Sequence, residues 1–222
     1  MKIPSLFVFA FVALFTGCTG AVASGVSDAQ IEELPGASTT EEGQASRSIQ
    51  TVDISLYLVV SDTDPSLSTR RSEDELREIL SGINDIWSQA DIFFDLRNVS
   101  TVNVRPDVLR RTIGGDLGAF FEGLRGDIQI TEPSTINAFY LREVGGPNGI
   151  NPFGSRTFFV IDEPSVHDRR VTSHEIGHIL GLHHDLEDAG ALMFSGTNGM
   201  EISEDEATVA RYVADGILRG IR

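Results

Sequence analysis

The sequence predicts an α+β domain from Ser48 to Arg222, and three observations point to that fold class. Apolar and polar residues alternate from Val52 to Val60, which is the period of a β-strand. From Leu76 to Trp87, apolar residues recur every three or four positions, as on one face of a helix. A continuous apolar run from Phe158 to Ile161 indicates a further, buried strand. Strands and helices therefore alternate along this part of the chain.

The first half of the domain contains one strong helix signal and several weaker ones. Ser72 and Glu75 form a capping box, which predicts that a helix begins there. A second strand is expected from Asp91 to Val99, where apolar residues occupy alternate positions. Two short helices, at Val108–Arg111 and Leu117–Leu124, are expected on either side of a glycine pair.

Strand signals return in the second half of the domain. Asp127–Thr131 and Thr135–Glu143 are predicted strands, and Phe158–Ile161 has the composition of a central parallel strand. Between them, Gly145–Gly154 is rich in glycine, asparagine and proline, which predicts a loop or an irregular edge strand. Asp168 is then in place to cap the helix that follows.

The C-terminal segment predicts one more helix. Ser203 and Glu206 form a second capping box. Val209, Val213 and Ile217 recur every four residues after it, so we expect these three side chains to form the buried face.

The segment from His174 to Asp185 reads His-Glu-Ile-Gly-His-Ile-Leu-Gly-Leu-His-His-Asp and carries the chemistry. Because His174 and His178 stand four residues apart, a helix would present both imidazoles on one face, where they could bind one zinc ion. Glu175 is adjacent to the first histidine and could act as general base on a zinc-activated water without being a ligand.

A third histidine completes the pattern. Gly181 can adopt the left-handed conformation that ends a helix, so the chain can turn back and bring His184 to the metal. Three protein ligands leave one tetrahedral position open for water or substrate, which is typical of a catalytic zinc site.

A lone histidine is more often a surface residue or a satisfied core residue than a ligand. All five histidines of this chain, however, lie between His167 and His184, which argues against that interpretation for the motif. His167 and His183 are outside the motif spacing, and both could simply face solvent.

The motif H-E-x-x-H-x-x-G-x-x-H, followed by Ala191-Leu192-Met193-Phe194, resembles the metzincin zinc endopeptidases. The residues before Met193 are most similar to the matrixin version, and Asp185 is similar to the adamalysin one. The resemblance implies a zincin fold, with a twisted, mixed five-stranded sheet, three main helices, and an active-site helix followed by a methionine turn. It also implies that Met193 lies beneath the zinc ligands, and that Asp185 orients a ligand or the helix end.

The same resemblance implies hydrolysis of peptide or protein substrates, with an extended substrate pairing with an edge strand. We expect that edge between Arg142 and Gly154, and we expect Phe194–Met200 to border a substrate pocket. Ser195 occupies the place where astacins and serralysins carry a tyrosine, which excludes a tyrosine ligand from that position.

Two other functions stay open at this point. The chain could be a non-catalytic surface lipoprotein that binds a partner through a metzincin-like fold, although the intact Glu175 argues against it. It could also buffer zinc, but a flexible histidine-rich tract is absent. Calcium ions could add stability, but no ordered Asp-x-Asp loop supports them.

The N-terminal residues indicate export. Residues 1–20 have a positive start and a short apolar run, as signal peptides do. Cys18 ends a lipobox-like sequence and would be the site of a lipid anchor to the membrane, whereas Ala21–Ala23 would suit an ordinary signal peptidase. Residues 21–47 have the composition of a flexible acidic linker. An address in the cell envelope or outside the cell would follow.

Charge and cysteine content set further limits. The formal net charge of −16 and the absence of a basic stripe argue against nucleic-acid binding. A single cysteine excludes an intramolecular disulfide, so we expect stability to come from the core and from bound ions. The oligomeric state does not follow from the sequence.

Overall fold

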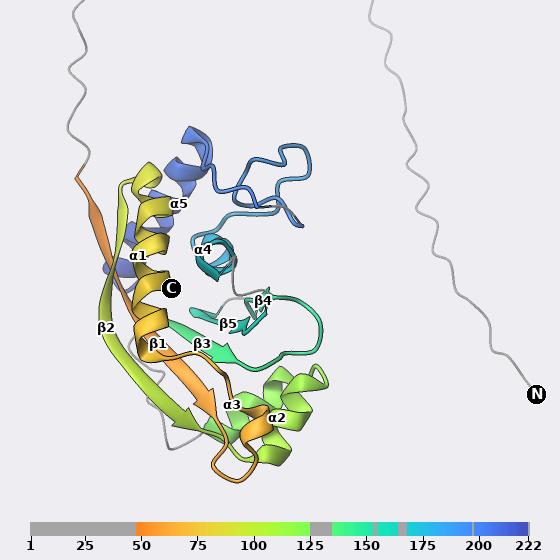
Figure 1. The fold of residues 1–222 in the computed structure, drawn as a ribbon. Helices are drawn as coiled ribbons and strands as arrows, with labels where there is room; N and C mark the ends of the chain where they lie inside the picture. The colour runs from red at the N-terminus through yellow and green to blue at the C-terminus, as the bar shows by residue number, and fades with distance from the viewer. Residues whose placement is uncertain (1–47, 125–134, 153–154, 164–167, 197, 222) are drawn as a thin grey trace, which may run out of the picture. The chain divides into compact units, whose positions relative to one another are not determined.

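The computed structural model describes residues 48–124, 135–152, 155–163, 168–196 and 198–221 (Figure 1). Several predictions lie outside these residues: the signal peptide with Cys18, the linker at 21–47, the strand at Asp127–Thr131, and His167. No helix in the described ranges is long and apolar enough to cross a membrane.

Five strands form one mixed sheet in the order β2-β1-β3-β5-β4. Four of them run parallel and β4 pairs antiparallel with β5. Their bounds are Gln50–Val60 for β1, Ile92–Asn103 for β2, Thr135–Leu141 for β3, Gly149–Ile150 for β4 and Thr157–Ile161 for β5. The predicted mixed, five-stranded sheet is confirmed. As predicted, β5 is a parallel interior strand: it pairs in parallel with β3, and its other neighbour is the antiparallel edge strand β4.

Helices cover both faces of this sheet. Three longer helices pack on one face, namely α1 (Glu73–Trp87), α4 (Asp168–Ile179) and α5 (Glu204–Leu218). Two short helices, α2 (Pro106–Ile113) and α3 (Leu117–Leu124), pack on the other. Two 3₁₀ turns lie at Pro65–Leu67 and Ser88–Ala90. The predicted α+β architecture with three main helices is therefore confirmed.

Alternation along β1 explains how both faces are filled. Val52, Ile54 and Leu56 point into the core beneath the longer helices. Tyr57 and Val59 point into the second core, beneath α2 and α3. Because side chains of a strand alternate between faces, one sequence run supplies both cores.

The two predicted capping boxes are present. The Ser72 amide donates to Glu75 Oε2 at 2.6 Å, and the Glu75 amide donates to Ser72 Oγ at 3.2 Å. The Ser203 and Glu206 pair at the start of α5 makes the same two bonds, at 2.9 and 3.3 Å. Each box satisfies backbone donors that a helix start leaves without partners.

The expected buried face of α5 was partly wrong. Only Ile217 of the predicted stripe is fully buried, while Val213 is half-buried and Val209 is exposed. The helix instead buries three small residues together with Ile217: Ala207, Ala210 and Ala214. The short alanine side chains let α5 pack closely against the elements beneath it. The face of α5 that is buried is therefore the face with small residues, not the face with valines.

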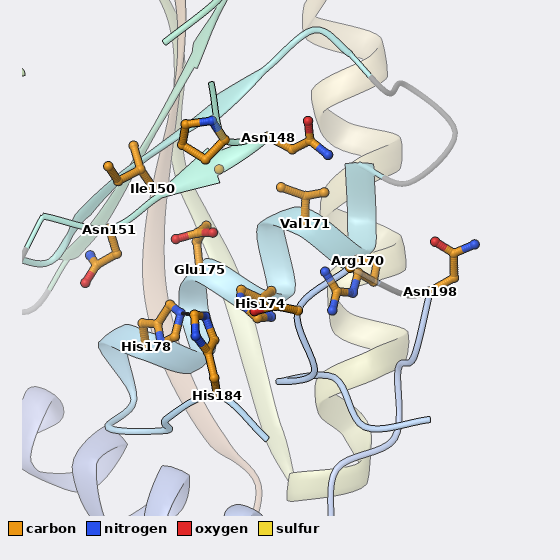
Figure 2. Close-up of a pocket in the computed structure, with 14 residues that line it drawn as sticks. Asn148, Ile150, Asn151, Arg170, Val171, His174, Glu175, His178, His184 and Asn198 are labelled. Carbon is orange, nitrogen blue, oxygen red and sulfur yellow. Dashed lines mark hydrogen bonds between the residues drawn. The ribbon is translucent and has the colours of Figure 1, made fainter. Parts of the chain in front are cut away.

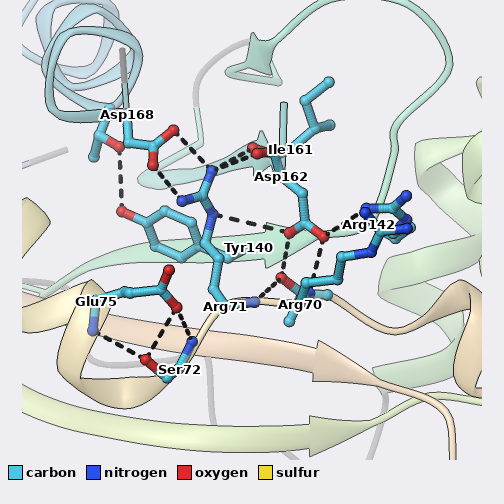
Figure 3. Close-up of polar contacts among 11 residues, drawn as sticks. Arg70, Arg71, Ser72, Glu75, Tyr140, Arg142, Ile161, Asp162 and Asp168 are labelled. Carbon is cyan, nitrogen blue, oxygen red and sulfur yellow. Dashed lines mark hydrogen bonds and ion pairs between the residues drawn. The ribbon is translucent and has the colours of Figure 1, made fainter. Parts of the chain in front are cut away.

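A buried ion-pair network joins the start of α1, the end of β5 and the start of α4 (Figure 3). Arg71 donates from both terminal nitrogens to Asp168, the first residue of α4, with one bond at 2.8 Å. It also donates to the backbone oxygens of Ile161 and Asp162, at 2.9 and 3.1 Å. The expected role of Asp168 as a helix cap is thus replaced by a pairing with Arg71. Burial raises the pKa of Asp168, and the guanidinium opposes that rise.

Asp162 and Tyr140 extend this network around Arg71. Asp162 accepts from the Thr69 hydroxyl, from the Arg70 amide at 2.9 Å and from Arg142 at 3.2 Å. The Arg71 guanidinium also lies 5.7 Å from the ring centroid of Tyr140. Three separate segments are therefore fixed relative to α4.

Replacing Arg71 by Met should lower the free energy of unfolding by about 3–5 kcal/mol, because the buried carboxylate of Asp168 would lose its counter-charge while Asp162 keeps Arg142. Denaturant unfolding followed by circular dichroism measures this loss. Arg105→Met is the matched control, since Arg105 pairs with Asp107 on the surface and its loss should cost less than about 0.5 kcal/mol. Equal effects of the two substitutions would contradict the role given to Arg71.

Candidate metal centre and cavity

Helix α4 and the turn after it bring the motif residues together (Figure 2). His174, Glu175 and His178 lie on α4, which ends at Ile179. Gly181 follows with φ of +84°, the left-handed conformation expected there. The chain then reverses and places His184 beside the other two histidines, with ring centroids 5.1 and 4.8 Å from theirs.

The three histidines are positioned to bind a metal ion. One nitrogen from each ring lies within 4.8 Å of the others. His174 Nδ1 is 2.9 Å from the Leu192 oxygen, and His178 Nδ1 is 3.0 Å from the Leu182 oxygen. A carbonyl can only accept, so both Nδ1 atoms carry the proton and both Nε2 atoms keep a free lone pair.

Burial keeps these rings neutral, which is the form that binds metal. Desolvation lowers the pKa of His174 to about 4 and also lowers the pKa of His178. His184 is exposed, so the cluster is open to solvent on one side. His178 Nε2 and His184 Nε2 are 3.1 Å apart, which shows how closely the nitrogens converge.

Glu175 is buried next to the histidines but points away from their cluster, toward the segment of Asn148 to Asn151 (Figure 2). Burial raises the pKa of its carboxyl to about 7, while Arg170 and the Asn151 amide oppose that rise. Such a group can hold or release a proton near neutral pH.

The edge strand β4 lies directly against this carboxylate. A Cβ atom added to Gly149 would lie 2.7 Å from Glu175 Oε1 and 2.9 Å from Val171 Cγ1. A larger residue at this position would force Glu175 or Val171 to move. The edge strand expected between Arg142 and Gly154 is therefore β4, although it is only two residues long.

A cavity of about 590 Å³ opens over these groups. Its walls come from residues 147–151, from the polar face of α4, from His184 and from Ser195, Gly196 and Asn198. The last three belong to Phe194–Met200, the segment expected to border a substrate pocket. The cavity thus joins the histidine cluster, the carboxylate and the edge strand in one space.

Met193 lies beneath the helix, fully buried, after a short turn. A Cβ on Gly177 would lie well inside van der Waals contact distance of its sulfur, so the methionine would have to move. Glycine at position 177 thus lets Met193 pack against the helix. The sequence analysis missed this residue because it occupies a variable position of the motif. The sequence did contain a hint, because glycine in the interior of a helix destabilises it relative to alanine. A glycine there therefore suggests that another group packs closely against the helix.

The roles expected for Asp185 differ from its contacts. Its carboxylate accepts from the amides of Glu187 at 2.7 Å and Asp188 at 2.9 Å, and these bonds lower its pKa. Its own amide donates to the Met193 oxygen at 3.1 Å. Asp185 therefore holds the loop after His184 against the methionine turn, and no bond to a histidine is among its contacts in the described residues. A short side chain bonds most readily to backbone amides two or three residues onward, which explains the difference.

Arg170 is a second residue that the sequence analysis missed. Its guanidinium donates to the oxygens of Leu192 at 3.0 Å, Gly199 at 3.3 Å and Phe194. Burial lowers its pKa, and nearby Glu175 opposes that shift. The sequence did contain a signal for it. Arg170 stands four residues before His174, so a helix places both side chains on the same face.

Comparison with known proteins supports the fold assignment. No protein-family model matches the sequence, and no curated protein does either. Among solved structures, archaemetzincin from Methanopyrus kandleri aligns with a TM-score of 0.51 at 14% identity, covering 74% of this chain and 96% of that one. The fold is metzincin-like.

Two further structures share this fold. Metalloproteinase-II from Bacteroides fragilis aligns with a TM-score of 0.51 at 14% identity, over 80% of this chain and 55% of that one. A chain from a structure of a chaperone-substrate complex aligns with a TM-score of 0.52 at 16% identity, over 78% of this chain but 35% of that one. This chain therefore spans only part of two of these neighbours.

Gly177→Ala should destabilise the protein by about 1–3 kcal/mol, because the added methyl group overlaps the Met193 sulfur. Gly216→Ala in α5 is the control, since nothing lies within 4 Å of its added methyl group and alanine favours the helix. Combining Gly177→Ala with Met193→Ala should cost less than the sum of the two single changes. Strict additivity in thermal or denaturant unfolding would contradict this contact.

Proposed function

We propose that this protein is a zinc-dependent endopeptidase that hydrolyses peptide bonds in the cavity above α4. The observation that carries the proposal is the convergence of three histidine nitrogens beside a buried carboxylate, in a cavity whose other wall is an edge strand. Metallopeptidases among the structural neighbours agree with it.

The donor set fits zinc. His174, His178 and His184 would hold the ion through nitrogen, and the two bonded Nδ1 atoms fix the rings of the first two. When bound, zinc would lower the pKa of water and polarise the substrate carbonyl. A site with three protein ligands and no fourth is suited to catalysis more than to structural support.

Glu175 would act as the general base and acid. Its carboxylate would take the proton of the attacking water and later give it to the amine that leaves. Burial, which raises the pKa of this group to about 7, suits both directions of transfer near neutral pH. An extended substrate would lie along β4 and hydrogen-bond to its free edge, which would bring the scissile bond over Glu175.

Export to the cell envelope is part of the same proposal. It rests on the signal-peptide pattern in residues 1–20 and on Cys18, the only cysteine, at the end of a lipobox-like sequence. Mass spectrometry of the mature N-terminus after membrane fractionation tests it. A lipidated Cys18 would support membrane anchoring, and an unmodified N-terminus after Ala23 would point to simple secretion.

Glu175→Gln should reduce peptide cleavage by at least about 100-fold while leaving one zinc ion per chain, because the carboxylate moves protons and is not a ligand. His184→Ala should lose both cleavage and tight zinc binding, because it removes one of three donors. Metal content by atomic emission and cleavage of a diverse peptide library measure the two properties.

His183→Ala is the matched control, since His183 is exposed and adjacent to His184 but outside the cluster. It should keep both zinc and activity. Tight zinc binding without cleavage of any peptide would favour the alternative, a partner-binding protein, and the absence of zinc binding would overturn the proposal.

Removal of the metal should also lower the melting temperature. An ion bound only by the folded state stabilises that state, so zinc should raise the melting temperature of the apo-protein in a concentration-dependent way. Glu175→Gln should keep this zinc-dependent shift and His184→Ala should lose most of it. Calorimetry with and without a chelator gives the comparison without relying on activity.

A further inference from the structure

Among the described residues that line the cavity, Arg170 is the one permanent cation, and it forms no ion pair with another described residue. No ion pair to Arg170 is found in the described part of the chain, in contrast to Arg71, which is buried against two carboxylates. Its bonds go to the backbone oxygens of Leu192, Phe194 and Gly199. Glu175 is the acid that affects its pKa, and it does so over a distance too long for an ion pair.

One nitrogen of this guanidinium is still available. Nε and Nη2 make the three bonds to carbonyls, whereas Nη1 makes none within the described residues. Among the described residues Nη1 is not a fully enclosed atom, so it keeps some exposed surface although Arg170 as a whole is buried. Arg170 lines the cavity, and Nη1 is the nitrogen of its guanidinium that keeps its hydrogen-bonding capacity there.

We propose that Arg170 makes this cavity selective for a substrate residue with a carboxylate side chain next to the cleaved bond. This inference rests on the proposed peptidase function. A carboxylate would provide the missing counter-charge and accept a charge-assisted hydrogen bond from Nη1. Burying an unpaired cation is costly, so a substrate that neutralises it gains more than one that does not.

The surrounding side chains are compatible with such an occupant. Asn148, Asn198 and Ser195 line the same cavity and can donate hydrogen bonds to a carboxylate. Glu175 is the only acidic residue that lines it among the described residues. The overall charge of −16 opposes an acidic substrate at long range, but that repulsion is screened beyond about 10 Å at moderate salt.

The first test uses the unmodified full-length chain with zinc and a peptide library made from a whole proteome. Aspartate or glutamate should be enriched at one position within two residues of the cleaved bond. In a matched peptide pair, changing that glutamate to glutamine should lower kcat/KM at least about tenfold. Enrichment of apolar or basic residues there, or equal cleavage of the pair, would overturn the inference.

The second test compares Arg170→Met with Arg169→Met. Both remove one positive charge from α4, but Arg169 is exposed and packs on Gly82 of α1, away from the cavity. The preference for glutamate over glutamine should disappear in Arg170→Met and persist in Arg169→Met. If Arg170→Met fails to fold because the loop loses its bonds, the peptide pair on the unmodified chain still decides.

Failure of the peptidase proposal would be recognised separately. If the unmodified chain cleaves no peptide, peptide arrays probed with full-length Glu175→Gln measure binding alone. Preferential binding of acidic peptides, lost in Glu175→Gln/Arg170→Met, would support carboxylate selection without catalysis. Binding that ignores acidic residues would overturn it.

Discussion

The site depends on the buried guanidinium of Arg71, because this group fixes where α4 begins. Arg71 joins Asp168 at the first position of α4 to the end of β5 and to the segment before α1. A charge network of this kind has few alternative arrangements, since any shift would leave a buried carboxylate unpaired. Two of the three clustered histidines and Glu175 then take their positions from the helix, about two and three turns further on. The geometry of the cavity therefore starts from an interaction that lies outside it.

Along its length, α4 is also fixed by close packing and by bonds to backbone oxygens. Gly177 allows the Met193 sulfur to lie against the helix, and His174 and Arg170 both bond to the Leu192 oxygen just before it. The methionine turn is thus attached to the helix through three different contacts. One of these contacts also sets the protonation of His174, since the Leu192 oxygen holds the proton on Nδ1 and leaves the lone pair of Nε2 free. The packing of this turn therefore also sets which nitrogen of His174 could bind a metal ion.

Much of this arrangement could be predicted from local patterns. The spacing of His174, His178 and His184 requires only helix geometry and a glycine turn, and both capping boxes are interactions within four residues. The contacts that could not be predicted join residues distant in sequence. Arg71 and Asp168 are 97 residues apart, and nothing local marks either as a partner. The buried face of α5 was misjudged for the same reason, because a stripe of valines is the stronger local signal while tertiary packing selects the alanines.

Arg170 and Glu175 line one cavity with opposite charges, yet the described structure holds them apart. An ion pair between them would lower the pKa of the carboxyl and reduce its ability to return a proton. The backbone oxygens of Leu192, Phe194 and Gly199 prevent this, because they accept the hydrogen bonds of Nε and Nη2 and hold the guanidinium in place. The carboxyl of Glu175 therefore stays poorly solvated, and this burial raises its pKa to about 7. The backbone oxygens that restrain Arg170 thus keep the pKa of Glu175 raised, which is the property that the proposed general base requires.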